Sequence, residues 1–196
     1  MIHVIKLGGS LSNDDRLVSW LEMLAVRGRG RVVIVPGGGP YADVVRAQQQ
    51  RWRLSDDHAH RMAVLAMDQF ALQMHGMKSE LALTSTLAEI LEVIANNQSA
   101  IWLPSAMVLS EKTLAMSWDI TSDSLAAWLA SVLGADRLAL VKSCDIAVDA
   151  TIGYLAQQGI VDRGFMEMTT NAPYEIQIIS ASDHARIELE LMQSPD

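Results

Sequence analysis

The chain has 196 residues, of which 50% are hydrophobic and 19% are charged, and this is enough to bury one sizeable core. Aspartates and glutamates number 23 against 15 lysines and arginines, and the formal net charge of −8 argues against general binding to nucleic acid or anionic membranes. We therefore expect a single domain over residues 1–196 in which positive charge is scarce.

Short apolar runs rich in β-branched residues alternate with longer segments of helical periodicity. The apolar runs predict five strands, over residues 2–7, 31–35, 101–104, 137–141 and 175–179. The other segments predict six helices, over residues 14–26, 40–51, 56–77, 80–96, 123–133 and 183–192. This alternation is typical of βαβ crossovers, so we expect an α/β fold whose parallel sheet binds ligands where its strands end.

An apolar stripe runs along the predicted helix over residues 56–77. Val64, Met67, Ala71 and Met74 recur there at intervals of three and four. Such a stripe packs into the core of the chain, or part of it forms a contact between subunits. The second alternative agrees with a homo-oligomer.

The single cysteine, Cys144, excludes an intramolecular disulfide, and no cysteine–histidine cluster indicates a protein-held metal. The apolar run over residues 2–7 is too short for the core of a signal peptide, and no run of about 18 apolar residues follows it. We expect a cytoplasmic protein without membrane partners.

The first predicted strand ends in Lys6-Leu7-Gly8-Gly9-Ser10, and the second runs into three glycines framed by prolines, Pro36 to Pro40. Glycines allow backbone N–H groups to approach phosphate oxygens closely. The spacing matches neither GxxxxGK[ST] nor GxGxxG. Adjacent strand ends of this kind could face one anionic group from two sides, which suits phosphoryl transfer.

Two later segments also carry polar residues at structural boundaries. Thr121 or Ser122 is expected to cap a helix with Asp123 or Ser124 in its first turn, which leaves Asp119 without a structural role. The fourth predicted strand runs into Lys142-Ser143-Cys144-Asp145. Two of the four lysines therefore close predicted strands, and the other two are Lys78 and Lys112.

With these segments in view, the chain resembles the amino acid kinase family, whose fold is shared by acetylglutamate, glutamate, aspartate, uridylate and isopentenyl phosphate kinases. The matching segments are residues 6–10, 35–40, 121–124 and 142–145. The resemblance implies a three-layer αβα sandwich, with an acceptor-binding half of about residues 1–110 and a nucleotide-binding half of about residues 111–196. It also implies ATP, with Mg²⁺ carried by the nucleotide phosphates.

The resemblance further implies a role for each matching residue. Lys6 would neutralise the transferring phosphoryl group, and Asp123 would orient that lysine. The nucleotide phosphates would be bound by Gly8, Gly9, Ser10, Lys142, Ser143, Asp145 and Arg163. The acceptor side would include Gly37, Gly38, Gly39, Asp119 and Thr121.

Two departures from the family pattern concern the nucleotide. Many members carry a late lysine that contacts the leaving phosphate, whereas residues 159–165 contain none, so Lys142 or Arg163 is expected to supply that charge. The usual DVDG turn is reduced to Asp145-Ile146-Ala147-Val148.

The chain is shorter than most members of the family, and in this it resembles the kinases of methanofuran-type cofactor synthesis, which phosphorylate an aminomethylfuran-methyl phosphate. Asp119 matches an acceptor-contacting asparagine of acetylglutamate kinases, and a carboxylate there would attract an amine. Alternatively, Asp119 is a surface loop residue. Five arginines could bind an acceptor phosphate, although most are expected to be solvated: Arg16, Arg46, Arg51, Arg53 and Arg61.

Two other kinds of acceptor remain open, a nucleoside monophosphate such as uridylate and an amino acid carboxylate. A function of another class is also open, in which the chain binds a nucleotide or oxyanion without transferring a group. The absent late lysine favours that alternative, and the retained Lys6 and Asp123 oppose it.

Overall fold

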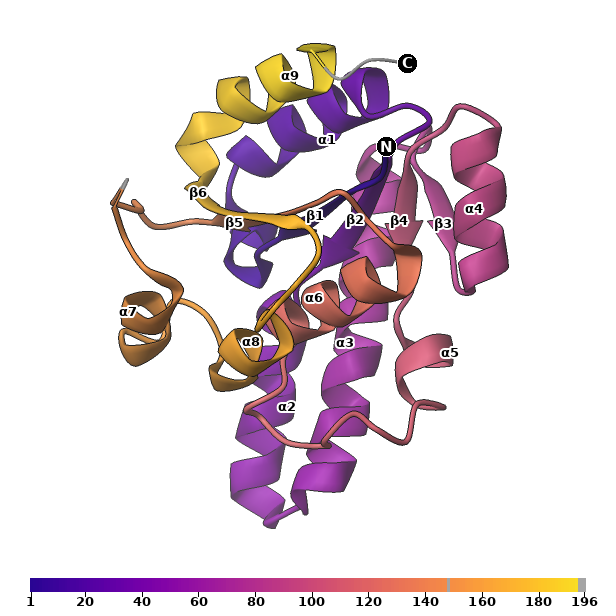
Figure 1. Ribbon diagram of the computed structural model, residues 1–196. Coiled ribbons are helices and arrows are strands. Elements are labelled where there is room, and N and C mark those ends of the chain that lie inside the picture. The colour runs from indigo at the N-terminus through magenta and orange to yellow at the C-terminus, as the bar shows by residue number, and fades with distance from the viewer. Residues whose placement is uncertain (148, 194–196) are drawn as a thin grey trace.

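The computed structural model describes residues 1–147 and 149–193. Its parallel sheet contains β1 (His3–Leu7), β2 (Val32–Pro36), β3 (Ala82–Thr84), β4 (Ala100–Trp102), β5 (Arg137–Lys142) and β6 (Glu175–Ser180). The order across the sheet is β3-β4-β2-β1-β5-β6 (Figure 1). β1 therefore lies between the strands of the first half of the chain and those of the second.

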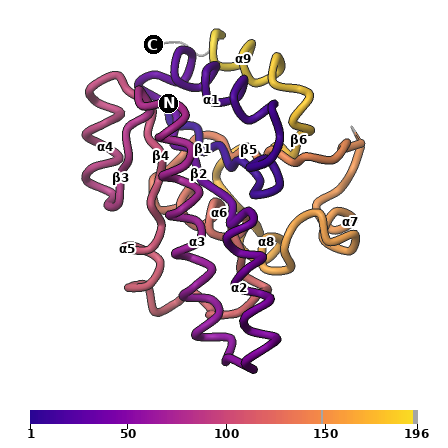
Figure 2. The backbone as a smooth tube through the Cα atoms, turned by 180° about the vertical axis from the view of Figure 1, so that it is seen from behind, coloured from indigo at the N-terminus to yellow at the C-terminus, as the bar shows by residue number. Residues whose placement is uncertain are grey.

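Helices cover both faces of this sheet. The described part of the chain forms α1 (Arg16–Arg27), α2 (Gly39–Trp52), α3 (Asp56–Met77), α4 (Leu87–Ala95), α5 (Ser105–Val108), α6 (Ser122–Leu133), α7 (Ile152–Gln157), α8 (Arg163–Met168) and α9 (His184–Gln193). α1 and α9 lie on one face and α6 on the other, while α2 and α3 extend side by side beyond the sheet (Figures 1 and 2). The expected αβα sandwich is confirmed.

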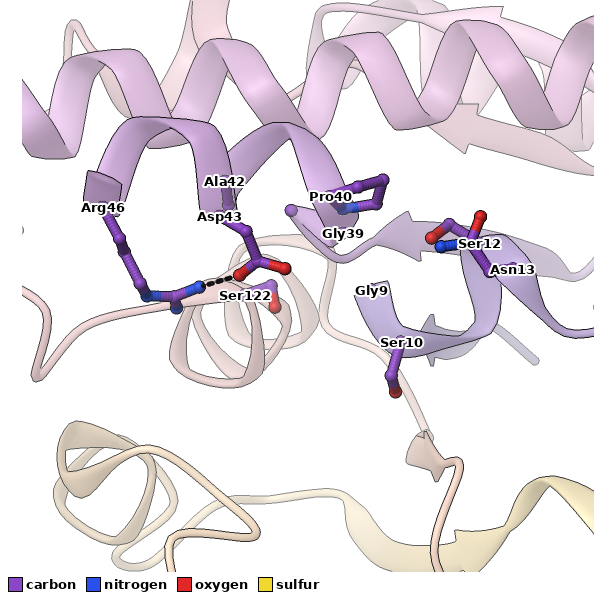
Figure 3. Close-up of a pocket in the computed structure, with 11 residues that line it drawn as sticks. Gly9, Ser10, Ser12, Asn13, Gly39, Pro40, Ala42, Asp43, Arg46 and Ser122 are labelled. Carbon is purple, nitrogen blue, oxygen red and sulfur yellow. Dashed lines mark hydrogen bonds and ion pairs between the residues drawn. The ribbon is translucent and has the colours of Figure 1, made fainter. Parts of the chain in front are cut away.

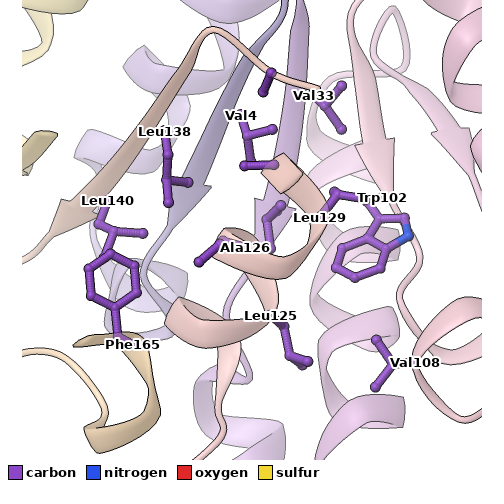
Figure 4. Packing of buried hydrophobic residues seen from close by; sticks show 14 of the residues in the cluster. Val4, Val33, Trp102, Val108, Leu125, Ala126, Leu129, Leu138, Leu140 and Phe165 are labelled. Atoms are coloured by element: carbon purple, nitrogen blue, oxygen red, sulfur yellow. The ribbon is translucent and has the colours of Figure 1, made fainter. Parts of the chain in front are cut away.

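The alternation of side chains along β1 divides the core into two layers. Ile5 and Leu7 point toward α1 and α9, and Trp20 of α1 lies fully buried there. Val4 points to the opposite face, where it packs with β5 and with Leu129 of α6 (Figure 4). Each large apolar side chain buried in this way contributes about 1.5–3 kcal/mol. Because Lys6 follows Val4 by two residues, it shares the face covered by α6.

The methionine-containing stripe of α3 belongs to the core. Val64, Met67, Ala71 and Met74 are all buried within the chain, so core packing is confirmed and a subunit contact through this stripe is wrong.

The predicted helix over residues 80–96 is wrong in its first part. Residues 82–84 form the edge strand β3, which pairs with β4, and α4 begins only at Leu87. Thr86 caps α4 by accepting a hydrogen bond from the Glu89 backbone N–H, a signal that the Thr-x-x-Glu spacing carried in the sequence. β3 forms by pairing with β4, 18 residues further along the chain. Its three residues are too few to show a hydrophobic pattern typical of either a helix or a strand.

Candidate active site

Two buried lysines and one buried aspartate meet at the carboxyl end of the sheet. Lys6 of β1 pairs in register with Leu140 of β5, so Lys142 lies two residues further along β5 on the same face. Asp123, in the first turn of α6, reaches both: its Oδ1 lies 2.8 Å from Lys6 Nζ and its Oδ2 lies 2.6 Å from Lys142 Nζ. The side chains of Lys6 and Asp123 are each only 5% exposed.

Burial and charge act in opposite directions on this cluster. Burial raises the pKa of the Asp123 carboxyl, but attraction to the two ammonium groups outweighs it, so the net shift is downward and the group is ionised. For Lys142, burial together with repulsion from Lys6 outweighs the attraction of Asp123 and lowers its pKa to about 8. With both lysines protonated, two positive charges face one negative charge, and the buried excess favours an anion.

The two glycine turns pack backbone against backbone beside this cluster. The Gly8 N–H donates to the carbonyl of Val141, and the Gly37 N–H donates to the carbonyl of Leu7, at 3.1 and 2.9 Å. A Cβ atom on Gly9 would clash with the backbone nitrogen of Gly39, and one on Gly37 would clash with the nitrogen of Gly9. The predicted approach of the two turns is thus present, and it leaves no room for side chains.

A cavity of about 300 Å³ opens beside these turns (Figure 3). Gly9 and Ser10 line it from the first turn, Gly38 and Gly39 from the second, and Ser122 from the start of α6. A smaller, more apolar cavity of about 70 Å³ adjoins it, and residues of α2 and α3 line this one together with Trp118 and Thr121. The glycine turns, α2 and the N-terminus of α6, where Ser122 precedes Asp123, therefore border one recess.

Ser10 and Ser143 link the turn after β1 to the end of β5. Ser10 donates a hydrogen bond from its hydroxyl to that of Ser143 at 2.8 Å. Arg16, which the sequence groups with the acceptor-side arginines, donates to the carbonyl of Ser143 at 3.2 Å and is held by Asp14. Asp145 is exposed nearby, and of the four-residue turn that it begins, Val148 lies outside the described residues. Arg16 therefore contacts the end of β5.

Asp162 joins α6 to α8 and is a residue that sequence reasoning missed. Its carboxylate accepts hydrogen bonds from the backbone N–H groups of Thr121 and Ser124 at 2.9 and 3.1 Å, and from both of their hydroxyls. It also accepts from the Phe165 N–H at 2.9 Å, at the start of α8. Asp162 thereby fixes the helix turn that carries Asp123. Its position before Arg163-Gly164 is typical of a helix N-cap, the one signal that the sequence offered.

Asp119 and Arg163 lie outside the buried cluster. The Arg163 side chain is 87% exposed and that of Asp119 is 63% exposed, with 3.8 Å between Arg163 Nη1 and Asp119 Oδ1. Asp119 is not among the residues that line either cavity next to the glycine turns. The backbone carbonyl of Asp119 does accept a hydrogen bond from Gly164, so the loop and α8 are joined.

A model of the amino acid kinase family matches residues 1–146, which include β1 to β5, both glycine turns, Asp123 and Lys142. The chain belongs to the amino acid kinase family.

Within the described residues, no group of histidine, cysteine, aspartate or glutamate side chains has the arrangement of a metal site, and no helix is long and apolar enough to span a bilayer.

Several solved structures have a similar fold over almost the whole chain. Uridylate kinase from Archaeoglobus fulgidus is 16% identical, with a TM-score of 0.72 over 99% of this chain and 97% of that one. UMP kinase from Ureaplasma parvum is 14% identical, with a TM-score of 0.71 over 99% and 96%. An isopentenyl phosphate kinase is 16% identical, with a TM-score of 0.63 over 100% and 98%.

Among curated proteins, the chain is similar to the [5-(aminomethyl)furan-3-yl]methyl phosphate kinase of Methanocaldococcus jannaschii. The two are 34% identical over 125 residues, which are 63% of this chain. The match spans 57% of the length of that relative.

Proposed function

We propose that this protein is an ATP-dependent kinase that transfers the γ-phosphoryl group to the phosphate of an aminomethylfuran-methyl phosphate, in the synthesis of a methanofuran-type cofactor. The observation that carries the kinase proposal is the buried cluster in which Asp123 holds the ammonium groups of Lys6 and Lys142 at 2.8 and 2.6 Å, near the glycine turns that line part of a cavity. The name of the Methanocaldococcus relative supports the acceptor.

In the proposed reaction, an oxygen of the acceptor phosphate forms a bond to the γ-phosphorus while the bond from that phosphorus to the β–γ bridging oxygen breaks. The acceptor becomes a diphosphate, and ADP leaves with the bridging oxygen. Lys6 and Lys142 neutralise negative charge on the transferring group, and Asp123 fixes the spacing between their ammonium groups. Backbone N–H groups of Gly9 and Ser10 bind phosphate oxygens from the β1 side. Gly8, whose own N–H donates to the Val141 carbonyl, lets the backbone come close to the phosphates, and Gly37, Gly38 and Gly39 belong to the acceptor side.

Lys142 supplies the charge of the absent late lysine in this proposal. Its Nζ shares one carboxylate with Lys6, whereas the guanidinium of Arg163 lies on the surface and faces Asp119. A buried ammonium acts in a weakly screened environment, where a charge stabilises a phosphoryl group more strongly than on the surface. In this proposal Arg163, Ser143 and Asp145 bind the part of the nucleotide that lies nearer the protein surface.

ATP fits the charge of the site, because the excess buried positive charge and the closely packed glycine turns suit a polyphosphate. A cavity of about 260 Å³ along β6, lined by apolar residues such as Ile146 and Ile152 and by polar ones such as Gln177 and Asp183, could hold the nucleoside. Mg²⁺ carried by the phosphates would neutralise further charge on them when bound.

We also propose that the protein works in the cytoplasm and that it forms a homo-oligomer. Light scattering would test the homo-oligomer.

A panel of acceptors tests the proposed function. Purified protein would be incubated with ATP, Mg²⁺ and either the aminomethylfuran-methyl phosphate, uridylate, acetylglutamate or glutamate, and the products identified by mass spectrometry. We expect a diphosphate from the first acceptor and loss of transfer in Lys6→Met, while Lys112→Met, which changes an exposed loop lysine, retains it. Transfer only to a carboxylate would contradict the acceptor assignment, and ATP binding without transfer to any acceptor would favour a non-catalytic role.

A further inference from the structure

The two cavities beside the glycine turns share a side chain of α2, Arg46. Its guanidinium carbon lies 4.5 Å from the ring centroid of Trp118, over the face of the indole. The Trp118 Nε1–H donates to Gln49 Oε1 at 2.6 Å, so α2 fixes the ring that supports the guanidinium. Arg46 is therefore held in place before any ligand binds.

Arg46 in turn holds an acidic side chain at the cavity. Arg46 Nη1 lies 2.8 Å from Asp43 Oδ1, and Figure 3 shows both side chains extending from α2 on the side of the cavity opposite Gly9 and Ser10. Asp43, Arg46 and Gln49 recur every three residues and thus share one face of the helix. Among the described residues that line the two cavities, Asp43 is the only acid.

A carboxylate in this position conflicts with a purely anionic acceptor. The glycine backbone that lines part of the cavity suits a phosphate, whereas Asp43, exposed beside Arg46, offers an acidic oxygen that favours an acceptor which also carries a cation. An acceptor that carries an ammonium group some distance from its phosphate satisfies both ends of the cavity. The carboxylate of Asp119, by comparison, faces Arg163 outside it.

We propose that Asp43 is the specificity-determining carboxylate that binds the ammonium group of a phosphate-bearing acceptor, and that Arg46, supported by Trp118, is the positioning residue that orients it. The assignment rests on the proposed kinase function and deepens it. Asp43 excludes acceptors whose phosphate has no accompanying cation. Arg46 acts through Asp43, whose carboxylate it holds at 2.8 Å.

The test compares two acceptors that differ only in the amine: the aminomethylfuran-methyl phosphate and the same molecule with a methyl group in place of the aminomethyl group. The wild-type chain should prefer the first by at least about tenfold in kcat/KM, as expected for a charge-assisted hydrogen bond. In Asp43→Asn this preference should fall to less than about threefold, chiefly through a higher KM for the amine-bearing acceptor. Asp43→Glu, which retains the charge, should keep most of the preference.

Asp57→Asn is the matched control, because Asp57 forms a similar exposed pair with Arg61 on α3 and lines neither cavity. It should leave the preference unchanged. Arg46→Gln should lower the preference, chiefly through a higher KM for the amine-bearing acceptor. An unchanged preference in Asp43→Asn, or loss of the preference in Asp119→Asn instead, would overturn the assignment of Asp43. Failure of the wild-type chain to phosphorylate either acceptor would overturn the proposed function itself, a result distinct from an unchanged ratio.

Discussion

Asp123 Oδ2 accepts a hydrogen bond from Lys142 Nζ at 2.6 Å, across an interval of 19 residues that takes the chain along α6 and back through β5. The other oxygen of the same carboxylate faces Lys6 at 2.8 Å. One aspartate therefore sets the distance between two buried ammonium groups, which otherwise would repel each other. The predictions below follow from this cluster and from the backbone that supports it.

Replacing Lys142 should impair turnover more than folding. Lys142→Met removes one of two charges expected to stabilise the transferring phosphoryl group, so kcat should fall by roughly 100- to 1000-fold. The free energy of unfolding should change little or rise, because an apolar side chain avoids the cost of burying an ammonium. Steady-state kinetics and denaturant titration measure the two effects. A comparable loss in Arg163→Met, with Lys142→Met active, would assign the charge to Arg163 instead.

The activity should depend on pH through Lys142. Its pKa of about 8 means that the ammonium form is lost as pH rises through that value, so kcat/KM for ATP should fall above about pH 8. Bound phosphate stabilises the ammonium form, so the decline in kcat should occur at higher pH than the decline in kcat/KM. In Lys142→Arg, any residual activity should lack this decline because a guanidinium stays charged.

The contribution of Lys142 to the free energy of unfolding should rise with pH, whereas kcat/KM should fall. The folded-state pKa of Lys142 lies below its ordinary value of 10.5, so between pH 8 and 10.5 the unfolded chain binds more protons at this group than the folded chain does. The contribution of Lys142 to the free energy of unfolding therefore rises with pH across that window. Denaturant titrations of the wild type and Lys142→Met isolate it, and an identical pH dependence in both would contradict the lowered pKa.

Gly9→Ala should destabilise the fold and abolish transfer. The added Cβ would meet the backbone of Gly39, which cannot move away as a flexible side chain could, so we expect a loss of about 1–3 kcal/mol, as in overpacked cores. Gly76→Ala in α3 is the matched control, because apart from the adjoining backbone of α3 its added Cβ would meet nothing within 4 Å. That substitution should stabilise the helix by up to about 1 kcal/mol and leave activity intact. Thermal melting and turnover would be measured for both.

Asp162→Ala should lower both stability and kcat. It removes the acceptor for the first turns of α6 and α8, a loss of about 1–3 kcal/mol, and releases the turn that carries Asp123. Glu167→Gln, an exposed acid on α8, should have no comparable effect. If Asp162→Ala melts lower but retains full kcat at a temperature where it is folded, Asp162 supports only the fold.

The sequence was most informative where local chemistry and strand periodicity agreed. Lys6 and Lys142 lie near or at the ends of apolar strands, so their position at one edge of the sheet follows from parallel pairing. β3 and Asp162 depend on contacts between distant segments: Asp162 reaches Thr121 across 41 residues. Likewise, the choice between Asp43 and Asp119 as a cavity carboxylate required knowing that α2 faces the turn after β1. No local pattern contains that information.

The contact between Gly9 and the turn over residues 37–39 is made by backbone atoms alone, so the part of the cavity that it lines has a shape independent of side-chain identity. The neighbouring face of α2, by contrast, presents Asp43 and Arg46 as replaceable side chains. A change of acceptor could thus be achieved by substitutions on one helix while the phosphoryl-transfer geometry stays intact. For protein engineering, α2 is where the preference of this scaffold can be altered, and the glycine turns are where it cannot.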